Sequence, residues 1–232
     1  MRSSDVKRGG MDDFTAVAAL ADPVRRRLYR YVAAQQDAVG REQAAEGAGV
    51  PLHIARFHLE KLVDEGLLDT EYRRLTGRAG PGAGRPAKLY RRTAAEVSVQ
   101  LPERSYDLIG SVLAGAVARS LEGEALGSAL AREARDRGRT CGSSYDGSGS
   151  DLERAAGLLA EEGFEPSVDD GVLSLHNCPF DVLAREEPTL VCGVNLDYVD
   201  GALEGLGCRR LAARLEPAPD RCCVRVSRCK PA

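Results

Sequence analysis

The sequence predicts an α+β protein built from an N-terminal winged helix-turn-helix, a pair of long helices and a small C-terminal α+β domain. Three observations predict this class. Amphipathic helices followed by a Gly/Pro-rich hairpin occupy the first part, a long helical stretch rich in small residues follows, and all seven cysteines fall in the second half. We place the domains at residues 1–97, 98–140 and 141–232, and expect the middle part to form dimerisation helices.

Two helices are expected first, at about 12–20 and 23–35. Their apolar residues recur at helical spacing, from Phe14, Val17, Leu20 and Val24 to Leu28 and Val32. Asp22-Pro23 separates the two helices, because Asp is a good helix cap and Pro fits the first helical position.

A helix-turn-helix is expected next. Residues 41–48 form its first helix, Gly49 ends that helix, and a second helix runs over 52–65 until Gly66 stops it. We expect the buried stripe of the second helix to consist of Leu52, Ala55, Leu59, Leu62 and Val63.

A β-hairpin follows the second helix. Residues 68–75 and 88–92 have strand character, and residues 77–86 between them contain Gly, Pro, Ala and Arg. A helix-turn-helix followed by a hairpin with a basic tip is a winged helix.

The sequence after the hairpin predicts long helices followed by a domain of helices and strands. Apolar residues at helical spacing between 108 and 130 predict one or two long helices, which we interpret as a dimer seam, with a linker helix as the alternative. Beyond them we expect a Gly/Ser loop that contains Cys141, an amphipathic helix, strands around an Asp-Asp-Gly turn, a short strand at Cys192 that leads into a helix, and two final strands.

Composition narrows the possible functions. Residues 1–97 hold 17 Lys and Arg against 13 Asp and Glu, whereas residues 98–232 hold 15 against 22. This asymmetry predicts different partners for the two parts, although chance variation is the simpler interpretation. The chain has no Trp and 5% aromatic residues, which disfavours stacking on single-stranded nucleic acid. With no membrane-length apolar run and no signal peptide, we expect a cytoplasmic protein without a membrane partner.

The second helix of the helix-turn-helix presents candidate contacts to a double-stranded DNA operator. His53, Arg56 and Phe57 lie in its N-terminal turns, where a recognition helix reads base edges. Lys61, with the arginines at 25–27, is expected at phosphates. In the wing, Arg78 and Arg85 are expected in the minor groove. A solvated helix face is the alternative interpretation.

The segments "ALADPVRRRLYRYV", "GVPLHIARFHLEKLVDEGLL" and "GRPAKLYRR" carry a resemblance to a known group of regulators. They are similar to the ArsR-like and DeoR-like winged-helix repressors. Ala55 stands where those helices often have Val, which keeps the position small.

The cysteines suggest metal ligation or redox sensing. The cytosol is reducing, so structural disulfides are not expected. Cys178, Cys192, Cys208 and Cys222 are separated by 13, 15 and 13 residues, which is neither a zinc-ribbon nor a ferredoxin spacing. We place each of them at a strand end or turn, where thiolates from different elements can bind a soft metal or a cluster. Inert burial is the alternative, above all for Cys208.

A winged helix followed by "HNCPF", "VCGVN" and "PAPDRCCV" resembles the SufR-type iron–sulfur repressors over nearly the whole chain. The resemblance implies a repressor of iron–sulfur assembly genes with a [4Fe–4S] cluster that is lost to relieve repression, and the predicted dimer seam makes it a homodimer. It implies Cys178, Cys192 and Cys222 as cluster and metal ligands. The fourth ligand stays open among Cys208, His176, Asn177 and an outside group.

Three alternatives remain for the C-terminal part. Cys222 and Cys223 are neighbours, and with Cys208 they suit a thiol–disulfide switch without metal. A zinc-stabilised regulator is the second alternative, and a small-molecule-binding or enzymatic domain is the third. We expect no enzyme, because no catalytic triad, carboxylate pair or phosphate loop stands out. Neighbouring residues of a strand point to opposite faces, so only one of Cys222 and Cys223 can enter a given site, and the spacing favours Cys222.

Overall fold

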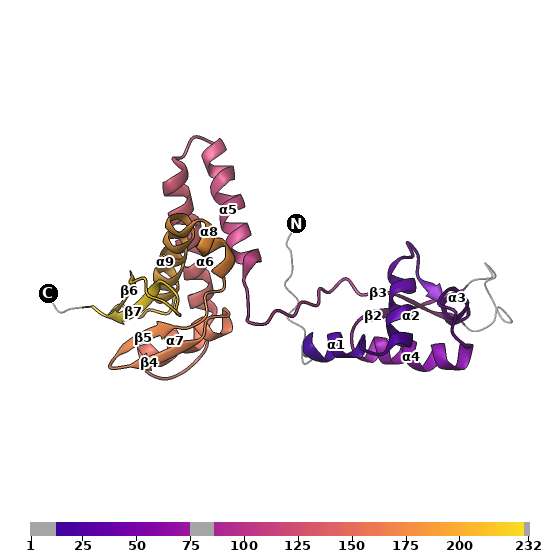
Figure 1. Ribbon diagram of the computed structural model, residues 1–232. Coiled ribbons are helices and arrows are strands. Elements are labelled where there is room, and N and C mark those ends of the chain that lie inside the picture. The colour runs from indigo at the N-terminus through magenta and orange to yellow at the C-terminus, as the bar shows by residue number, and fades with distance from the viewer. Residues whose placement is uncertain (1–12, 75–85, 230–232) are drawn as a thin grey trace. The chain divides into compact units, whose positions relative to one another are not determined.

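The computed structural model describes residues 13–74 and 86–229. The chain divides into two compact units, and the boundary along the sequence falls between Val99 and Gln100. Figure 1 shows the elements of each unit, and the two units are described separately. In the described residues, no helix is long and apolar enough to cross a membrane.

Within its described residues, the N-terminal unit contains four helices and a three-stranded sheet of order β1-β3-β2. These elements are α1 (Asp13–Ala19), α2 (Pro23–Ala33), β1 (Val39–Gly40), α3 (Arg41–Gly47), α4 (Leu52–Asp64), β2 (Leu68–Arg73) and β3 (Ala87–Arg92). Asp22 caps α2 by accepting the N–H groups of Val24 and Arg25, at 2.8 and 2.9 Å. The two-residue strand β1 was not predicted; Val39 pairs with Tyr90 on β3.

The turn between α3 and α4 brings the helix-turn-helix together. Gly49 has a φ of 61°, a conformation that Gly adopts without steric cost, and the Val50 N–H donates to the Ala45 carbonyl. The centre of the core consists of residues whose side chains are completely buried: Ala16, Leu28, Ala44, Ala55, Leu59 and Leu62.

Part of the predicted buried stripe is wrong. Leu52 is 45% exposed because it starts α4 at the edge of the unit, and Val63 is only half-buried. Phe14 and Val17 on α1 are also exposed, at 52% and 46%, since only Ala16 and Ala19 of this helix face the core.

The C-terminal unit joins five helices to a four-stranded antiparallel sheet of order β4-β5-β7-β6. Its elements are α5 (Tyr106–Leu121), α6 (Leu126–Ser144), α7 (Asp151–Glu161), β4 (Pro166–Asp169), β5 (Val172–Leu175), α8 (Asp181–Glu186), α9 (Pro188–Gly205), β6 (Leu211–Leu215) and β7 (Val224–Arg228). The predicted turn between β4 and β5 is present, with positive φ at Asp170 and Gly171.

Helix α9 is the centre of this unit, because it packs against α6 on one side and against β6 and β7 on the other. Glycines let α6 and α9 approach closely: a Cβ at Gly138 would meet the Tyr198 carbonyl oxygen at 2.0 Å, and one at Gly205 would meet the Arg139 carbonyl oxygen at 2.2 Å. The long helix expected at a dimer seam is therefore largely used within the chain.

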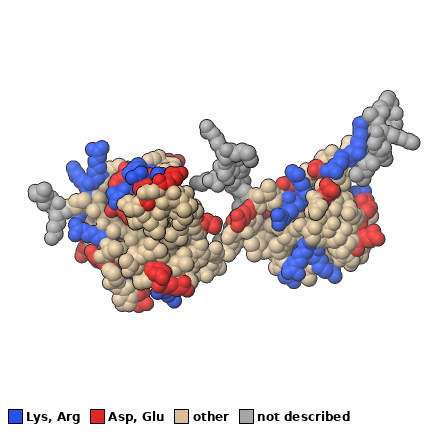
Figure 2. Space-filling view, turned by 90° about the horizontal axis from the view of Figure 1, so that it is seen from above, with Lys and Arg blue, Asp and Glu red and all other residues tan. Residues whose placement is uncertain are grey.

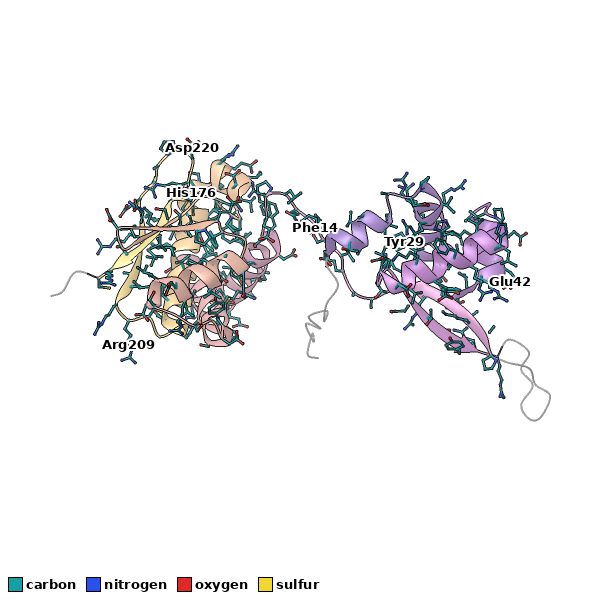
Figure 3. The ribbon with its side chains drawn as sticks, turned by 90° about the horizontal axis from the view of Figure 1, so that it is seen from below. Phe14, Tyr29, Glu42, His176, Arg209 and Asp220 are labelled. Carbon is teal, nitrogen blue, oxygen red and sulfur yellow. The ribbon has the colours of Figure 1, made fainter. Side chains whose placement is uncertain are left out.

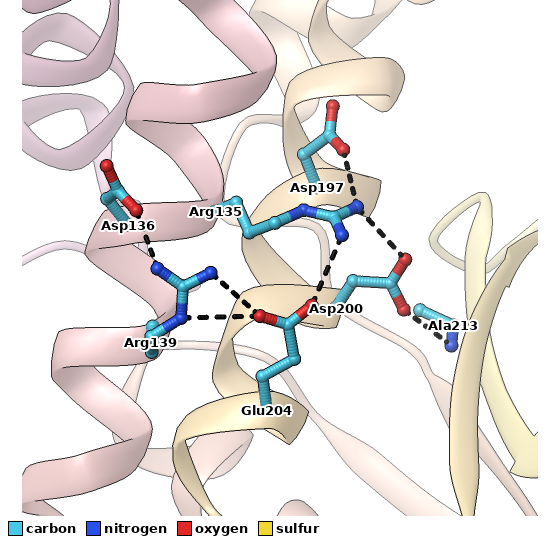
Figure 4. A network of polar contacts seen from close by, with 7 residues as sticks. All are labelled: Arg135, Asp136, Arg139, Asp197, Asp200, Glu204 and Ala213. Atoms are coloured by element: carbon cyan, nitrogen blue, oxygen red, sulfur yellow. Dashed lines mark hydrogen bonds and ion pairs between the residues drawn. The ribbon is translucent and has the colours of Figure 1, made fainter. Parts of the chain in front are cut away.

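Ion pairs border the contact between α6 and α9 (Figure 4). Arg135 contacts Asp197 at 3.1 Å and Glu204 at 3.2 Å, and Arg139 contacts Glu204 at 2.9 Å. Partly exposed pairs of this kind contribute little each, so we attribute the stability of the contact mainly to the close packing of the backbones.

Three local predictions are wrong. Cys141 lies in the last turns of α6 and not in a loop, because the helix continues to Ser144. Cys192 lies inside α9, which begins at Pro188 without a preceding strand. Cys222 and Cys223 precede β7 and are not part of a strand, so the argument that their side chains must diverge does not apply.

Candidate functional site

Helix α4 presents a mixed polar and apolar face away from the core of the N-terminal unit. His53, Arg56, Phe57 and Lys61 all lie on this face, which forms a surface depression together with Glu60 and Asp64. Phe57 is 66% exposed, so its ring is available to a partner that approaches this face of α4. The predicted face of α4 is therefore accessible to DNA.

Two contacts fix α4 to the wing strand β3. Glu60 accepts hydrogen bonds from Lys88 Nζ at 2.5 Å and from Tyr90 Oη at 2.8 Å. Burial acts to raise the pKa of Glu60, but the hydrogen bonds from Lys88 and Tyr90 outweigh it and lower the pKa. Burial and the same hydrogen bond raise the pKa of Tyr90. Glu60 thus sets the position of the wing against the helix and is not free for a base.

Basic residues also lie on the surface of the N-terminal unit. Figure 2 shows Lys and Arg side chains gathered in groups on the visible side of the N-terminal unit. Arg26 and Arg27 on α2 are exposed, whereas Lys61 forms an ion pair with Glu65 at 2.6 Å. Arg78 and Arg85, predicted for the minor groove, lie outside the described residues.

Four cysteines gather in the C-terminal unit, from three separate segments. Cys178 follows β5, Cys192 lies in the first turns of α9, and Cys222 and Cys223 precede β7. The Cys178 thiol interacts with that of Cys222, the Cys192 thiol interacts with that of Cys223, and Cys178 also acts on Cys192 electrostatically. We call these four residues the cysteine cluster. No disulfide joins the chain's seven cysteines, all of which are described.

Cys178 and Cys222 form an interacting pair of thiols whose pKa values move in opposite directions. The hydrogen bond from Cys222, with a further one from the Phe180 N–H, outweighs burial and lowers the pKa of Cys178 to about 7. The same hydrogen bond and burial raise the pKa of Cys222. Opposite shifts are expected of two groups that share one proton. Cys178 is therefore the thiol of this pair that ionises first.

Backbone and amide N–H groups face the sulfur of Cys222. Asn195 Nδ2 lies 3.2 Å from Cys222 Sγ, and the Val224 N–H lies 3.5 Å from it. Asn195 is 1% exposed, and its Oδ1 atom is buried without a hydrogen-bond partner. Such donors around a sulfur are the usual surroundings of a thiolate that binds a soft metal or a cluster.

Cys192 and Cys223 form the second pair. Burial, and then the interaction with Cys223, raises the pKa of Cys192 to about 12. Cys223 was expected in a thiol–disulfide switch, and Cys222 was expected in its place as cluster ligand, because a strand was predicted at this position. The signal was the Cys222-Cys223 doublet itself, since two successive residues outside a strand can serve one site.

Cys208 lies far from the cysteine cluster. It follows the C-terminal end of α9, whereas Cys192 lies near the beginning of that helix. At a rise of about 1.5 Å per residue the two lie roughly 20 Å apart along the axis. Cys208 Sγ instead contacts the Asp151 carbonyl oxygen at 3.8 Å, and the residue is buried in the core. The structure therefore separates Cys208 from the predicted ligands.

Other predicted candidates also lie away from the cluster or are committed elsewhere. His176 Nε2 contacts Ser167 Oγ at 2.8 Å, and Figure 3 shows His176 beside the strands of the C-terminal unit. Asn177 uses both ends of its amide: Nδ2 donates to the carbonyls of Glu103 and Gly163, and Oδ1 accepts from Arg104. Burial raises the pKa of Cys141 to about 11, with the Glu162 carboxylate adding to the effect.

The cysteine cluster supplies sulfur donors from three segments, the donor type that soft metals and iron–sulfur clusters use. Within residues 13–74 and 86–229, no three His, Cys, Asp or Glu side chains are grouped closely enough to hold one metal ion. The thiols of Cys178, Cys192, Cys222 and Cys223 would hold such an iron–sulfur cluster, and the N–H donors of Asn195 and Val224 face the sulfur of Cys222.

The comparisons with known proteins concern the N-terminal unit. The sequence model of the helix-turn-helix domain family matches residues 20–71, a range that runs from just before α2 into β2. No curated protein and no solved structure matches the chain. The N-terminal unit is thus a helix-turn-helix domain of the winged type, and it indicates a DNA-binding transcriptional regulator.

Proposed function

We propose that the protein is a homodimeric transcriptional repressor whose C-terminal unit senses iron–sulfur status through a [4Fe–4S] cluster. The observation that carries the proposal is the meeting of Cys178, Cys192, Cys222 and Cys223 in one place, although they come from three distant segments. When bound, such a cluster supplies a link between these segments that oxidants and iron shortage can remove.

Residues of the chain would provide both the ligands of this cluster and the hydrogen-bond donors around them. Cys178 provides a thiolate near neutral pH, which a soft metal requires as ligand. Asn195 and the Val224 N–H stabilise negative charge on Cys222. Since Cys192 is on α9 and Cys222 directly precedes β7, the cluster residues connect the central helix to the sheet.

DNA recognition in this proposal uses α4. Arg56 donates two hydrogen bonds to a guanine, His53 and Phe57 contact neighbouring base edges, and Lys61 and the α2 arginines contact phosphates. Two copies read two half-sites about one helical turn apart or a multiple of it. The exposed apolar side chains at the end of the α5–α6 hairpin, Val117, Leu121 and Leu126, are available for dimer contacts. Genes of iron–sulfur assembly are the proposed targets, and the cytoplasm is the proposed location.

A thiol–disulfide switch without metal is the second candidate, because Cys178 and Cys222 are in contact. In this candidate the Cys178 thiolate attacks a peroxide, the O–O bond breaks, and Cys178 becomes a sulfenic acid while hydroxide leaves. The Cys222 thiol then attacks the Cys178 sulfur, the S–O bond breaks, and the disulfide forms with release of water.

Protein purified without oxygen separates the two candidates. We expect bound iron and acid-labile sulfide in equal amounts and a broad visible absorption, all lost in Cys178→Ser. The cluster-containing protein is expected to retard a duplex selected from a random library, and iron removal is expected to weaken this binding. Colourless protein whose DNA affinity responds to peroxide and dithiothreitol would instead support the disulfide switch.

A further inference from the structure

The chain enters the C-terminal unit directly beside Cys178. Residues 103–105 follow the boundary between the two units, and residues 176–180 form the turn that carries Cys178. We call them the entry segment and the Cys178 turn. They are more than 70 residues apart in sequence and are joined by a dense set of hydrogen bonds.

Backbone and amide groups make the first part of this connection. The Ser105 N–H donates to the Pro179 carbonyl at 3.1 Å. Asn177 Nδ2 donates to the Glu103 carbonyl at 2.9 Å and to the Gly163 carbonyl at 2.6 Å. Asn177 is only 7% exposed, so these bonds are made in a place where lost partners are not replaced freely by water.

Arg104 makes the second part. Its Nη1 atom donates to Asn177 Oδ1 at 2.5 Å and to the Cys178 carbonyl at 3.3 Å, and its Nη2 atom lies 3.7 Å from Asp181 Oδ2. The Arg104 side chain is 17% exposed, although arginine is normally well solvated. The guanidinium therefore binds the backbone of the residue whose thiol belongs to the cysteine cluster.

We infer that Arg104 and Asn177 are positioning residues that couple the state of the cysteine cluster to the segment leading to the DNA-binding unit. The inference rests on the proposed function of the cluster as a sensor. While Cys178 is held with Cys222, its carbonyl and the amide of Asn177 stay in place and hold the entry segment. When Cys178 moves, the acceptors of Arg104 and the Pro179 carbonyl move with it, and the entry segment is released.

Hydrogen exchange of residues 100–106 tests this coupling in the full-length protein. We expect wild-type exchange there to rise at least tenfold when the cluster is removed with a chelator. In protein that carries no iron, alkylation of Cys178 with iodoacetamide, which separates it from Cys222, replaces the chelator. In Arg104→Ala, exchange should be fast at the outset and change less than twofold.

Arg185→Ala is the matched control. Arg185 also pairs with Asp181, at 2.8 Å, but it is 77% exposed and none of its observed contacts involves the entry segment or the Cys178 turn. It should behave like wild type. Asn177→Ala should reproduce the Arg104→Ala result by removing a different partner.

A DNA-binding readout completes the test. The ratio of affinities between the two cysteine states, measured on a duplex selected by the wild type, should fall at least fivefold in Arg104→Ala and stay unchanged in Arg185→Ala. The inference is overturned if exchange in residues 100–106 of wild type ignores the cysteine state, or if Arg104→Ala keeps the full affinity ratio. Absence of iron overturns only the proposed cluster.

Discussion

Glu60 connects the recognition helix to the wing through one carboxylate. Lys88 and Tyr90 both donate to it, and the net effect lowers its pKa even though burial opposes this. A carboxyl group whose pKa is lower in the folded than in the unfolded state adds stability above its unfolded pKa, and this stability is lost as the pH falls through the folded value.

Replacement of Glu60 by Gln should therefore have a pH-dependent effect. We expect Glu60→Gln to destabilise the protein above about pH 5, and the difference from wild type to vanish toward pH 3, since an unperturbed Glu has a pKa of about 4.3. Urea unfolding between pH 3 and pH 7 measures this. Glu46→Gln, at an exposed position of α3, serves as control, and a constant difference at all pH values would contradict the account.

Asn195 allows a second test with a single residue, because its side-chain amide faces the sulfur of Cys222. Asn195→Ala removes the Nδ2 donor from Cys222 while leaving all four thiols in place. We expect iron to be released to a chelator at least threefold faster, followed by loss of visible absorption. Gly193→Ala on the same helix is the control, because nothing lies within 4 Å of a Cβ there. Equal release rates in the three proteins would show that Asn195 has no part in the site.

At the scale of elements, the contact between α6 and α9 depends on backbone approach. Gly138→Ala would place a Cβ 2.0 Å from the Tyr198 carbonyl oxygen, so the helices must separate. Overpacking of this kind costs roughly 1–3 kcal/mol. Gly127→Ala on the same helix meets no atom within 4 Å and should be neutral or stabilising, because Ala favours helix over Gly. Urea unfolding compares the two, and equal stabilities would contradict the packing account.

The helix-turn-helix was predictable because its signals are local. Asp22-Pro23, Gly49 and the apolar spacing of α2 and α4 each act within a few residues, and the helices begin and end within about two residues of the predicted positions. The exposure of Leu52 and the pairing of Val39 with Tyr90 depend on residues distant in sequence, so periodicity alone missed them.

The cysteine site shows the limit of spacing arguments. Cys178, Cys192 and Cys222 were predicted as ligands of one cluster, and their thiols interact in pairs that Cys223 completes, whereas their role as ligands stays a proposal. Spacing did not show that a long helix separates Cys208 from Cys192 or that Cys223 precedes β7. Helix length and strand start are set by tertiary packing. Asn195 carried a usable signal, since it follows Cys192 by three residues and shares its helix face.

For the whole molecule, DNA binding should depend on α4 and not on charge in general. We expect Arg56→Ala to cost about 1–3 kcal/mol of binding free energy on a selected duplex, and to relax base preference at one position. Arg132→Ala removes the same charge from α6, where Arg132 pairs with Glu124 at 3.2 Å, and should bind like wild type. Fluorescence anisotropy at fixed salt measures both affinities. Similar losses in the two variants would point to nonspecific electrostatics.

The most direct test of the central claim compares iron and sulfide in Cys208→Ser and Cys223→Ser, both purified without oxygen beside wild type. The account predicts that Cys208→Ser keeps the wild-type iron, sulfide and visible spectrum, whereas Cys223→Ser loses at least half of the iron. Wild-type protein without iron and sulfide, or a cluster that survives in Cys223→Ser and disappears in Cys208→Ser, would contradict it.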